Sequence, residues 1–462
     1  MRPSNMHEQK YHTPINTLPD EILLRIFSIL IGWDTIYRGY WDSQRLWDYD
    51  RRVCQHRSRH VTNLSCVDTF WRRLVINTTS FWSHIDIFFE HGYWLPLGRF
   101  SRQCFARVKD APIELHINCG QTHRLYTAAA AIPNYLRDRT VTSLILTTLY
   151  PAVVEPIVGI YLNENTRSHL TKLQVELVSS MESVVCVPIP AQVNQGQFSE
   201  NLLRLNTLRL AAATVHWDSA RFSRLVDLQL RDVQPSPSMD QIYNILAASP
   251  ELCTIELEQL HLNSYESTGQ SRAPINLPKL TFLSLGGSDF EFVDRFLQVI
   301  ELGVGHLCLR LSIPEASYKE LESLHIPHKL TTLSLRIPDL PVALLGQRMA
   351  SLNDLATLAL ADQYVDDFDV AANSIGSEHT TLQRVVLRKC RITFIGLRRI
   401  ASIPSLRSLW IESCMYASRT IGFYSRELPE DELKWLEGSV PDLYVDYAHH
   451  GRIRCSLPWW LR

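Results

Sequence analysis

At 462 residues the chain is too long for one compact core, so we expect two or more domains or a repeat array. Hydrophobic residues make up 45% of it, which is ordinary for a folded protein and excludes wholesale disorder. A formal net charge of -2 and a pI near 6.8 give no electrostatic support for nucleic acid or an anionic membrane as a partner.

The cysteines and the first residues indicate the compartment. The ten cysteines are scattered and form no C-x-x-C pair, which favours reduced thiols. Residues 1–13 are polar and show no apolar signal-peptide region. The most apolar stretch, residues 151–162, contains Glu155 and is too short to span a bilayer. We therefore expect a soluble protein of the cytoplasm and/or nucleus.

A helix is predicted over residues 19–31. Pro19 suits the first helical position, and Asp20 and Glu21 place negative charge at the positive end of the helix dipole. Beyond them, only Arg25 and Ser28 interrupt a run of apolar residues. A helix that is apolar nearly all round must be covered on more than one side, so we expect a partner protein to cover it.

A second helix is predicted over residues 63–76. Leu64, Val67, Trp71 and Leu74 recur at helical spacing, so one face of this helix should be apolar. Trp82 is then expected to pack beneath it.

The two segments together resemble the F-box. The first half of the resemblance is Leu18-Pro19-x-Glu21-Ile22-Leu23-x-x-Ile26-Phe27-x-x-Leu30, and the second is Leu64-Ser-Cys-Val67-Asp-Thr-Phe70-Trp71-Arg-Arg-Leu74 followed by Phe81-Trp82. The resemblance implies docking on the Skp adaptor and, through it, on the cullin and RING subunits of a ubiquitin ligase. The adaptor contacts that it implies are Leu18, Pro19, Ile22, Leu23, Ile26, Leu30, Leu64, Val67, Trp71 and Leu74.

From residue 141 onward the sequence contains a regular repeat. Units of the form L-x-x-L-x-L recur, and from Leu205 onward they begin 20 to 28 residues apart, close to the period of leucine-rich repeats. The eleven units begin at Val141, Leu170, Leu205, Leu225, Leu252, Leu280, His306, Leu330, Leu355, Leu382 and Leu406.

The position three residues after each unit should form the turn out of the strand. Cys390 and Cys414 occupy it in two units, which resembles the cysteine-containing leucine-rich repeats often found behind an F-box. Other units depart from this, so we expect irregular turns at Ala213, Val233, Leu260 and Pro338.

Helices are predicted over residues 239–249 and 291–300, with a last helix over 427–440 and a short strand over 443–447. Residues 458–461 could cover the exposed end of the stack, since terminal repeats need capping.

These predictions define an α/β protein: an all-helical F-box followed by a solenoid with a curved parallel sheet. The expected order is a disordered lead-in, the F-box with an insertion at 32–60, a linker with the solenoid N-cap, the repeats, and a C-terminal tail. The boundaries are 1–14, 15–90, 91–140, 141–447 and 448–462. The insertion could be a tolerated surface loop, a gene-model error or a functional loop with aromatic and basic contacts.

Side chains alternate across a strand, so the polar residues between the inward-facing leucines should line the concave face. In the later repeats this face has more basic than acidic residues and includes a tryptophan. This composition suits binding of an acidic or phosphorylated segment of a partner. The face could also be polar for solubility alone. The predicted substrate-binding residues are Arg231, Glu256, Arg310, Arg336, Arg384, Arg388 and Trp410.

Catalytic and metal motifs give no support for an enzyme. G-x-S-x-G, P-loop, H-E-x-x-H and kinase signatures are absent from the sequence. The spacing of Cys54, His56, His60 and Cys66 matches no common zinc site, and we expect no metal and no cofactor.

We therefore expect a non-catalytic, substrate-recognition subunit of a Skp–cullin–F-box ubiquitin ligase, whose repeats capture an unknown target protein. The alternative is a leucine-rich-repeat interaction scaffold that is not linked to ubiquitin transfer.

Overall fold

The structure is a computed structural model, and every structural statement below concerns the residues that it describes. These are residues 14–31, 60–89, 99–119, 139–162, 169–178, 187–188, 200–218, 220–260, 273–287, 289–303, 306–314, 318–338, 351–365, 381–417, 424–425 and 427–446. The greater part of the 32–60 insertion, the lead-in before Pro14, the proposed cap at 458–461 and the tail lie outside them. No helix in these ranges is both long and apolar enough to cross a bilayer.

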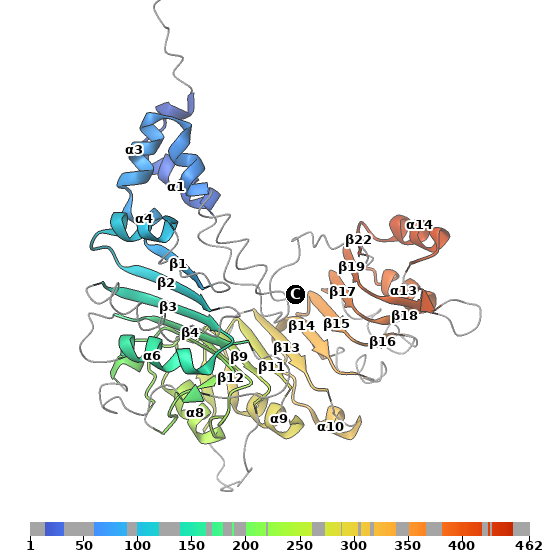
Figure 1. Cartoon of the computed structure of the whole chain (residues 1–462). Coiled ribbons are helices and arrows are strands. Elements are labelled where there is room, and N and C mark those ends of the chain that lie inside the picture. Colours follow the sequence, from blue (N-terminus) through green and yellow to red (C-terminus); the bar gives the residue numbers. More distant parts are fainter. Residues whose placement is uncertain are drawn as a thin grey trace, which may run out of the picture.

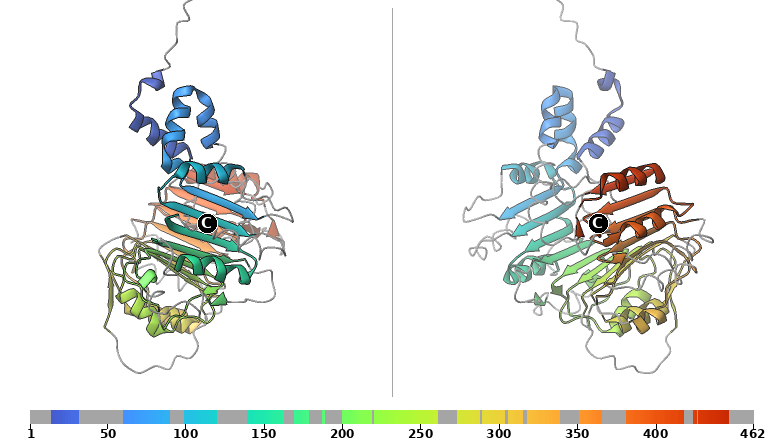
Figure 2. Two further views of the ribbon diagram at one scale, coloured as in Figure 1. Left: turned by 60° about the vertical axis from the view of Figure 1, so that its left-hand side comes forward. Right: turned by 90° about the vertical axis from the view of Figure 1, so that its right-hand side faces the viewer.

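A small helical unit stands at one end of the molecule (Figures 1 and 2). Its core forms because Leu23, Phe27 and Ile31 fall on one side of α1 and are fully buried. The predicted helix at 19–31 is thereby confirmed. The unit consists of η1 (Pro14–Thr17), α1 (Asp20–Ile31), a helix over residues 60–67, α3 (Thr69–Asn77) and η2 (Thr79–Phe81).

The prediction of one continuous helix over 63–76 is wrong, because the chain leaves the helix at Asp68. Asp68 has extended backbone angles and acts as the N-cap of α3, where its carboxylate accepts a hydrogen bond from the Trp71 N–H at 2.7 Å. The break turns Val67 outward, away from Leu64 and Trp71, which are both buried. Trp82 packs beneath α3 as expected, with its indole N–H donating to the Val75 carbonyl at 2.9 Å.

A single curved sheet organises the rest of the described chain (Figure 1). It has 14 strands, and each pairs in parallel with its neighbours. In spatial order the strands are β1 (His84–Phe89), β2 (Ile113–Cys119), β3 (Val141–Thr148), β4 (Lys172–Leu177), β6 (Thr207–Ala211), β8 (Asp227–Arg231), β9 (Thr254–Glu258), β11 (Phe282–Gly286), β13 (Leu307–Ser312), β14 (Leu330–Arg336), β15 (Thr357–Ala361), β17 (Arg384–Arg388), β19 (Ser408–Glu412) and β22 (Asp442–Asp446).

The repeat explains the sheet. Each of the eleven predicted L-x-x-L-x-L units supplies one strand, from β3 to β19, so this prediction is confirmed. Leucines at equivalent positions stack in register: Leu283 lies between Ile255 and Leu309, and all three are fully buried. The strands therefore stay parallel because each repeat can bury its leucines only against those of its neighbours.

Helices and short strands cover the outer side of the curved sheet (Figures 1 and 2). The predicted helices at 239–249, 291–300 and 427–440 are found as α8 (Met239–Ala247), α9 (Phe290–Val299) and α14 (Glu430–Ser439). The helices that follow the helical unit are α4 (Arg99–Val108), α6 (Pro151–Leu162), α8 (Met239–Ala247), α9 (Phe290–Val299), α10 (Tyr318–Ser323), α13 (Phe394–Ala401) and α14 (Glu430–Ser439). The short strands are β5 (Val187–Pro188), β7 (Ala213–Thr214), β10 (Ile275–Leu277), β12 (Ile300–Leu302), β16 (Tyr364–Val365), β18 (Arg391–Thr393), β20 (Met415–Ala417) and β21 (Tyr424–Ser425).

The sheet begins earlier than the expected boundary at residue 141. Residues 84–89, which we expected within the F-box, form the edge strand β1, and residues 113–119, which we expected in a linker, form β2. Neither strand carries the spacing of the leucine repeat. The buried apolar residues are Ile85 and Ile87 on β1, and Ile113, Leu115 and Ile117 on β2. Helix α4 contacts β1 and η2 and so joins the helical unit to the sheet.

A regular turn follows many strands, although the sequence predicts irregular ones. The residue after the strand has a left-handed backbone, and its N–H donates to the last residue of the next strand, as from Lys389 to the Glu412 carbonyl at 2.9 Å. The following side chain points inward, so Ala213, Val233 and Leu260 are buried like Cys390 and Cys414. Of the four positions where we expected irregular turns, only Pro338 differs from the regular arrangement, because its side chain is exposed. The left-handed residues are Ala212, Asp232, Gln259, Gly287, Asp362, Lys389 and Ser413.

Candidate functional site

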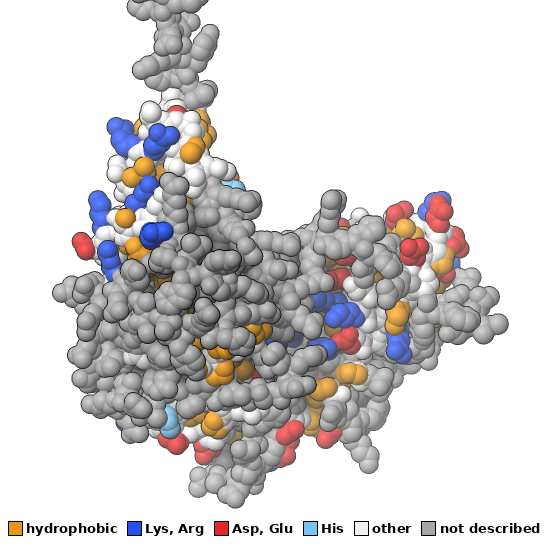
Figure 3. Space-filling view, viewed as in Figure 1, with side chains coloured by type: hydrophobic (Ala, Val, Ile, Leu, Met, Phe, Trp, Pro, Cys, Tyr) orange, Lys and Arg blue, Asp and Glu red, His pale blue; other side chains and the backbone are white. Residues whose placement is uncertain are grey.

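An exposed apolar face lies on the helical unit. Among the described residues seven large hydrophobic side chains are exposed, and five of them belong to this unit. We call these five the apolar face: Ile29 (65% exposed), Val67 (58%), Leu30 (53%), Ile22 (49%) and Ile15 (39%). Figure 3 shows hydrophobic side chains on the surface of this part of the molecule.

The apolar face follows from the periodicity of α1. With 3.6 residues per turn, Leu23, Phe27 and Ile31 fall on one side, and Ile22 and Ile29 fall on another. The first side packs on α3, where the rings of Phe27 and Trp71 lie 4.6 Å apart. The second side has nothing in the described part of the chain to cover it fully. Large exposed apolar side chains gathered on one small unit make this face a candidate interaction site.

The predicted adaptor contacts divide into three groups. Pro19, Ile22, Leu30 and Val67 are exposed, and Leu18, Ile26 and Leu74 are half-buried. Leu23, Leu64 and Trp71 are buried. For these last three the expected direct contact has to be revised, because their side chains form the core that holds the helices together. The sequence pattern missed Ile15 and Ile29, which are exposed.

Polar contacts fix the segment before α1 against α3. The Trp71 indole N–H donates to Asn16 Oδ1 at 2.7 Å, and the Asn16 amide donates to Asp68 Oδ2 at 3.1 Å. The segment before α1 is thus held against the N-terminal end of α3.

A second candidate surface is the concave face of the sheet. Registers place residues of neighbouring strands side by side in rows, because side chains alternate across each strand. All seven predicted substrate-binding residues lie in three such rows, so their positions share one face of the sheet. The central row runs Arg209, Gln229, Glu256, Ser284, Arg310, Ser334, Ala359, Val386, Trp410 and Tyr444.

The concave face is less basic than the sequence suggests, because acidic side chains accompany its arginines. Arg209 Nη2 lies 2.5 Å from Asp227 Oδ2, and Arg336 Nε lies 2.6 Å from Asp362 Oδ2. Of the seven predicted residues, Arg336 is exposed, and Arg231, Arg310, Arg384, Arg388 and Trp410 are half-buried.

Glu256 is the seventh and is buried at the centre of the face. Burial and the nearby charge of Glu258 raise the pKa of its carboxyl to about 8, against the opposing effect of Arg310, Arg209 and Arg231. It is therefore unsuited to direct contact with a partner.

An aromatic pair stands at the C-terminal end of the central row. The rings of Trp410 and Tyr444 lie 4.8 Å apart, and Trp410 also packs beside Ala359 and Val386. Tyr444 is a further candidate for this surface that the sequence pattern missed, because β22 lies beyond the last L-x-x-L-x-L unit. Tryptophan and arginine together are typical of energetically important interface positions.

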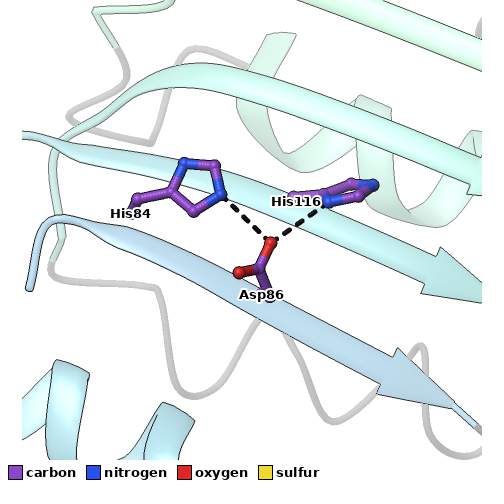
Figure 4. A group of neighbouring side chains, drawn as sticks. All are labelled: His84, Asp86 and His116. Atoms are coloured by element: carbon purple, nitrogen blue, oxygen red, sulfur yellow. Dashed lines mark hydrogen bonds and ion pairs between the residues drawn. The ribbon is translucent and has the colours of Figure 1, made fainter. Parts of the chain in front are cut away.

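The opposite end of the concave face carries a polar cluster that spacing alone did not indicate. His84 and Asp86 lie on β1, and His116 lies beside Asp86 on β2 (Figure 4). Asp86 Oδ1 is 3.0 Å from His84 Nε2 and 3.1 Å from His116 Nδ1. Burial tends to raise the pKa of Asp86, but the charge of His84 and the hydrogen bonds from both imidazoles hold it well below its ordinary value.

The strands and repeats define the class of protein: a leucine-rich-repeat solenoid with a helical unit at its N-terminal end. No protein-family model matches the chain, and no curated protein matches it. Solved structures to which it is similar include an internalin from Listeria monocytogenes, at 13% identity and a TM-score of 0.31 over 62% of this chain and 84% of that one. A leucine-rich-repeat protein from Leptospira interrogans is 16% identical, at a TM-score of 0.31 over 76% of this chain and 92% of that one. These similarities are low, so the class rests on the chain's own strands and repeats.

Proposed function

We propose that the chain is a protein-interaction protein with two binding surfaces: the apolar face for a constant partner and the concave face for a cargo protein. The observation that carries this proposal is the concentration of exposed aliphatic side chains on the helical unit, beside its buried core of Leu23, Phe27 and Ile31. Leaving such side chains in water is unfavourable, and burying each against a partner stabilises the complex by roughly 1–3 kcal/mol.

The constant partner that we propose is the Skp adaptor of a cullin-RING ubiquitin ligase. The support is the F-box resemblance of residues 18–30 and 64–82, together with the outward placement of Ile22, Leu30 and Val67. In this proposal the chain is a non-catalytic substrate receptor acting in the cytoplasm or nucleus. Ubiquitin then reaches the cargo because the complex holds it near the ligase, with the chemistry in other subunits.

Affinity purification of the full chain under proteasome inhibition tests both surfaces. We expect the adaptor, the cullin and a cargo protein to be recovered together. Ile22→Ser with Ile29→Ser should remove adaptor and cullin while keeping the cargo. A matched control is Ile395→Ser, since Ile395 on α13 is exposed to the same degree as Val67 but lies on the opposite end of the solenoid.

The cargo surface has its own variant. Arg336→Glu with Trp410→Ala changes the exposed cation and the aromatic position of the concave face, and should remove the cargo while keeping the adaptor. Adaptor recovery that is unaffected by the apolar-face variant would count against the docking proposal.

The alternative is a leucine-rich-repeat scaffold that is not linked to ubiquitin transfer. It would use the same two surfaces with a different constant partner. Recovery of a cargo that depends on the concave face, with neither adaptor nor cullin present, would favour this alternative.

A further inference from the structure

We propose that His84, Asp86 and His116 bind a divalent transition-metal ion, with Zn²⁺ as the best match, and that this ion fastens the edge strand β1 to β2. Among the described residues they are the set of three potential ligands whose donor atoms all lie within 4.8 Å of one another. Because His116 is 30 residues from Asp86 in sequence, a search for metal-binding spacings does not find this group.

Strand geometry brings the three donors together. Asp86 pairs with His116 across the parallel strands, and His84 lies two residues before Asp86, so all three side chains point to the same face. Figure 4 shows both imidazoles directed at the carboxylate. Ligands about 2.0–2.1 Å from a tetrahedral Zn²⁺ are roughly 3.3–3.4 Å apart. The nitrogen–oxygen distances of 3.0 and 3.1 Å therefore need to open by only a few tenths of an ångström.

The donor set fits zinc, and the burial of the donors favours zinc over ions that keep several open positions. Two imidazole nitrogens and one carboxylate oxygen form a ligand set that is found in zinc proteins and, where further positions stay open, in non-haem iron(II) proteins. The side chains of His84, Asp86 and His116 are 2%, 11% and 1% exposed. So little access to water suits a four-coordinate ion with one remaining position better than an octahedral ion that keeps several waters.

Glu114 provides a second, independent observation. His84 lies between two carboxylates: its Nε2 is 3.0 Å from Asp86 and its Nδ1 is 3.3 Å from Glu114 Oε2. A neutral imidazole carries one N–H and can donate to only one of them. With a metal ion on Nε2, the Nδ1–H donates to Glu114, which is the usual arrangement around a metal-bound histidine.

The position of the cluster suggests what the ion would do. Strand β1 is the edge of the sheet and follows directly after the helical unit, so its attachment determines how that unit is held on the solenoid. An ion bridging β1 and β2 would fix this junction independently of the partners bound at either surface.

The test is a metal titration of the purified full chain after removal of metals with a chelator. We expect the wild type to bind one more equivalent of Zn²⁺ than His116→Gln, and Zn²⁺ to raise the unfolding temperature of the wild type but not of the variant. Co²⁺ should give the visible absorption of a tetrahedral site only in the wild type. His306→Gln, which replaces an exposed histidine, is the matched control and should behave as the wild type.

A second variant guards against a folding defect in His116→Gln. Glu114 is half exposed, and Glu114→Gln should fold while weakening Zn²⁺ binding about 10- to 100-fold. Equal stoichiometry and equal affinity in the wild type, His116→Gln and Glu114→Gln would overturn the proposal and leave a hydrogen-bonded cluster without an ion.

Discussion

The ring of Phe27 packs on the ring of Trp71 with their centroids 4.6 Å apart, and this contact decides which side of α1 faces the solvent. Trp71 is itself fixed by its hydrogen bond to Asn16, so the helix has little freedom to rotate. Ile29 is left on the exposed side. One buried aromatic pair thus creates the apolar face that we propose as the docking surface.

The first prediction separates core from surface on this helix. Phe27→Ala should lower the free energy of unfolding of the helical unit by about 3–5 kcal/mol, because it removes a fully buried ring. Ile29→Ala should change it by less than about 0.5 kcal/mol, because the side chain is exposed. Urea unfolding followed by tryptophan fluorescence measures both. Equal effects of the two variants would mean that α1 is oriented differently.

The second prediction concerns the left-handed turn. Gly287 has φ of 65°, and a Cβ there would lie 2.7 Å from Gln259 Cγ. Gly287→Ala should therefore destabilise the solenoid by about 1–2 kcal/mol from backbone strain alone. Gly438 in α14 has nothing within 4 Å of the same position, so Gly438→Ala should be neutral or stabilise by up to about 1 kcal/mol. Thermal unfolding of the two variants compares them, and a Gly287→Ala protein as stable as Gly438→Ala would refute the turn geometry.

The third prediction is a pH dependence of stability. Since burial and Glu258 raise the pKa of Glu256 from 4.5 to about 8, the folded state keeps a proton that the unfolded state releases. The stability that this proton contributes is complete below the unfolded pKa, declines as the pH rises, and is lost above the folded pKa.

Glu256→Gln removes this dependence. Relative to the wild type, the variant should become more stable as the pH is raised from about 5 to about 9 in a thermal-unfolding series. Glu437→Gln replaces an exposed carboxylate and should show no such trend. If the difference between Glu256→Gln and the wild type stays constant with pH, Glu256 is charged throughout and the buried environment assigned to it is wrong.

Much of the solenoid could be predicted from the sequence because leucine burial repeats. Leu283 and its equivalents have one inward position per strand, so their spacing alone identifies strands β3 to β19. The first two strands lie outside the predicted repeats because β1 and β2 bury their apolar residues, mostly isoleucines, without the repeat spacing. The left-handed turns could not be predicted for a different reason. Residues other than glycine, such as Lys389, adopt the left-handed backbone there because their N–H is hydrogen-bonded to the next strand.

The sites were harder to predict than the fold. The excess of hydrophobic residues on α1 predicted that part of this helix needs a partner to cover it. Leu23 and Ile22 cannot be assigned to core or surface until the second helix is in place. On the concave face, alternation gives the right residues but not their charge partners, because Asp227 and Asp362 come from neighbouring repeats. His116 meets Asp86 only through strand pairing.

The measurement that tests the central claim most directly is the dissociation constant between the purified chain and the Skp adaptor. We predict a stable complex with the wild type, and at least about a tenfold weaker one for each of Ile22→Ser and Ile29→Ser, since a buried interface anchor contributes more than about 1.4 kcal/mol. Ile395→Ser should bind as the wild type does. An absence of binding by the wild type, or equal binding by all four proteins, would contradict the assignment of the apolar face as the adaptor's docking surface.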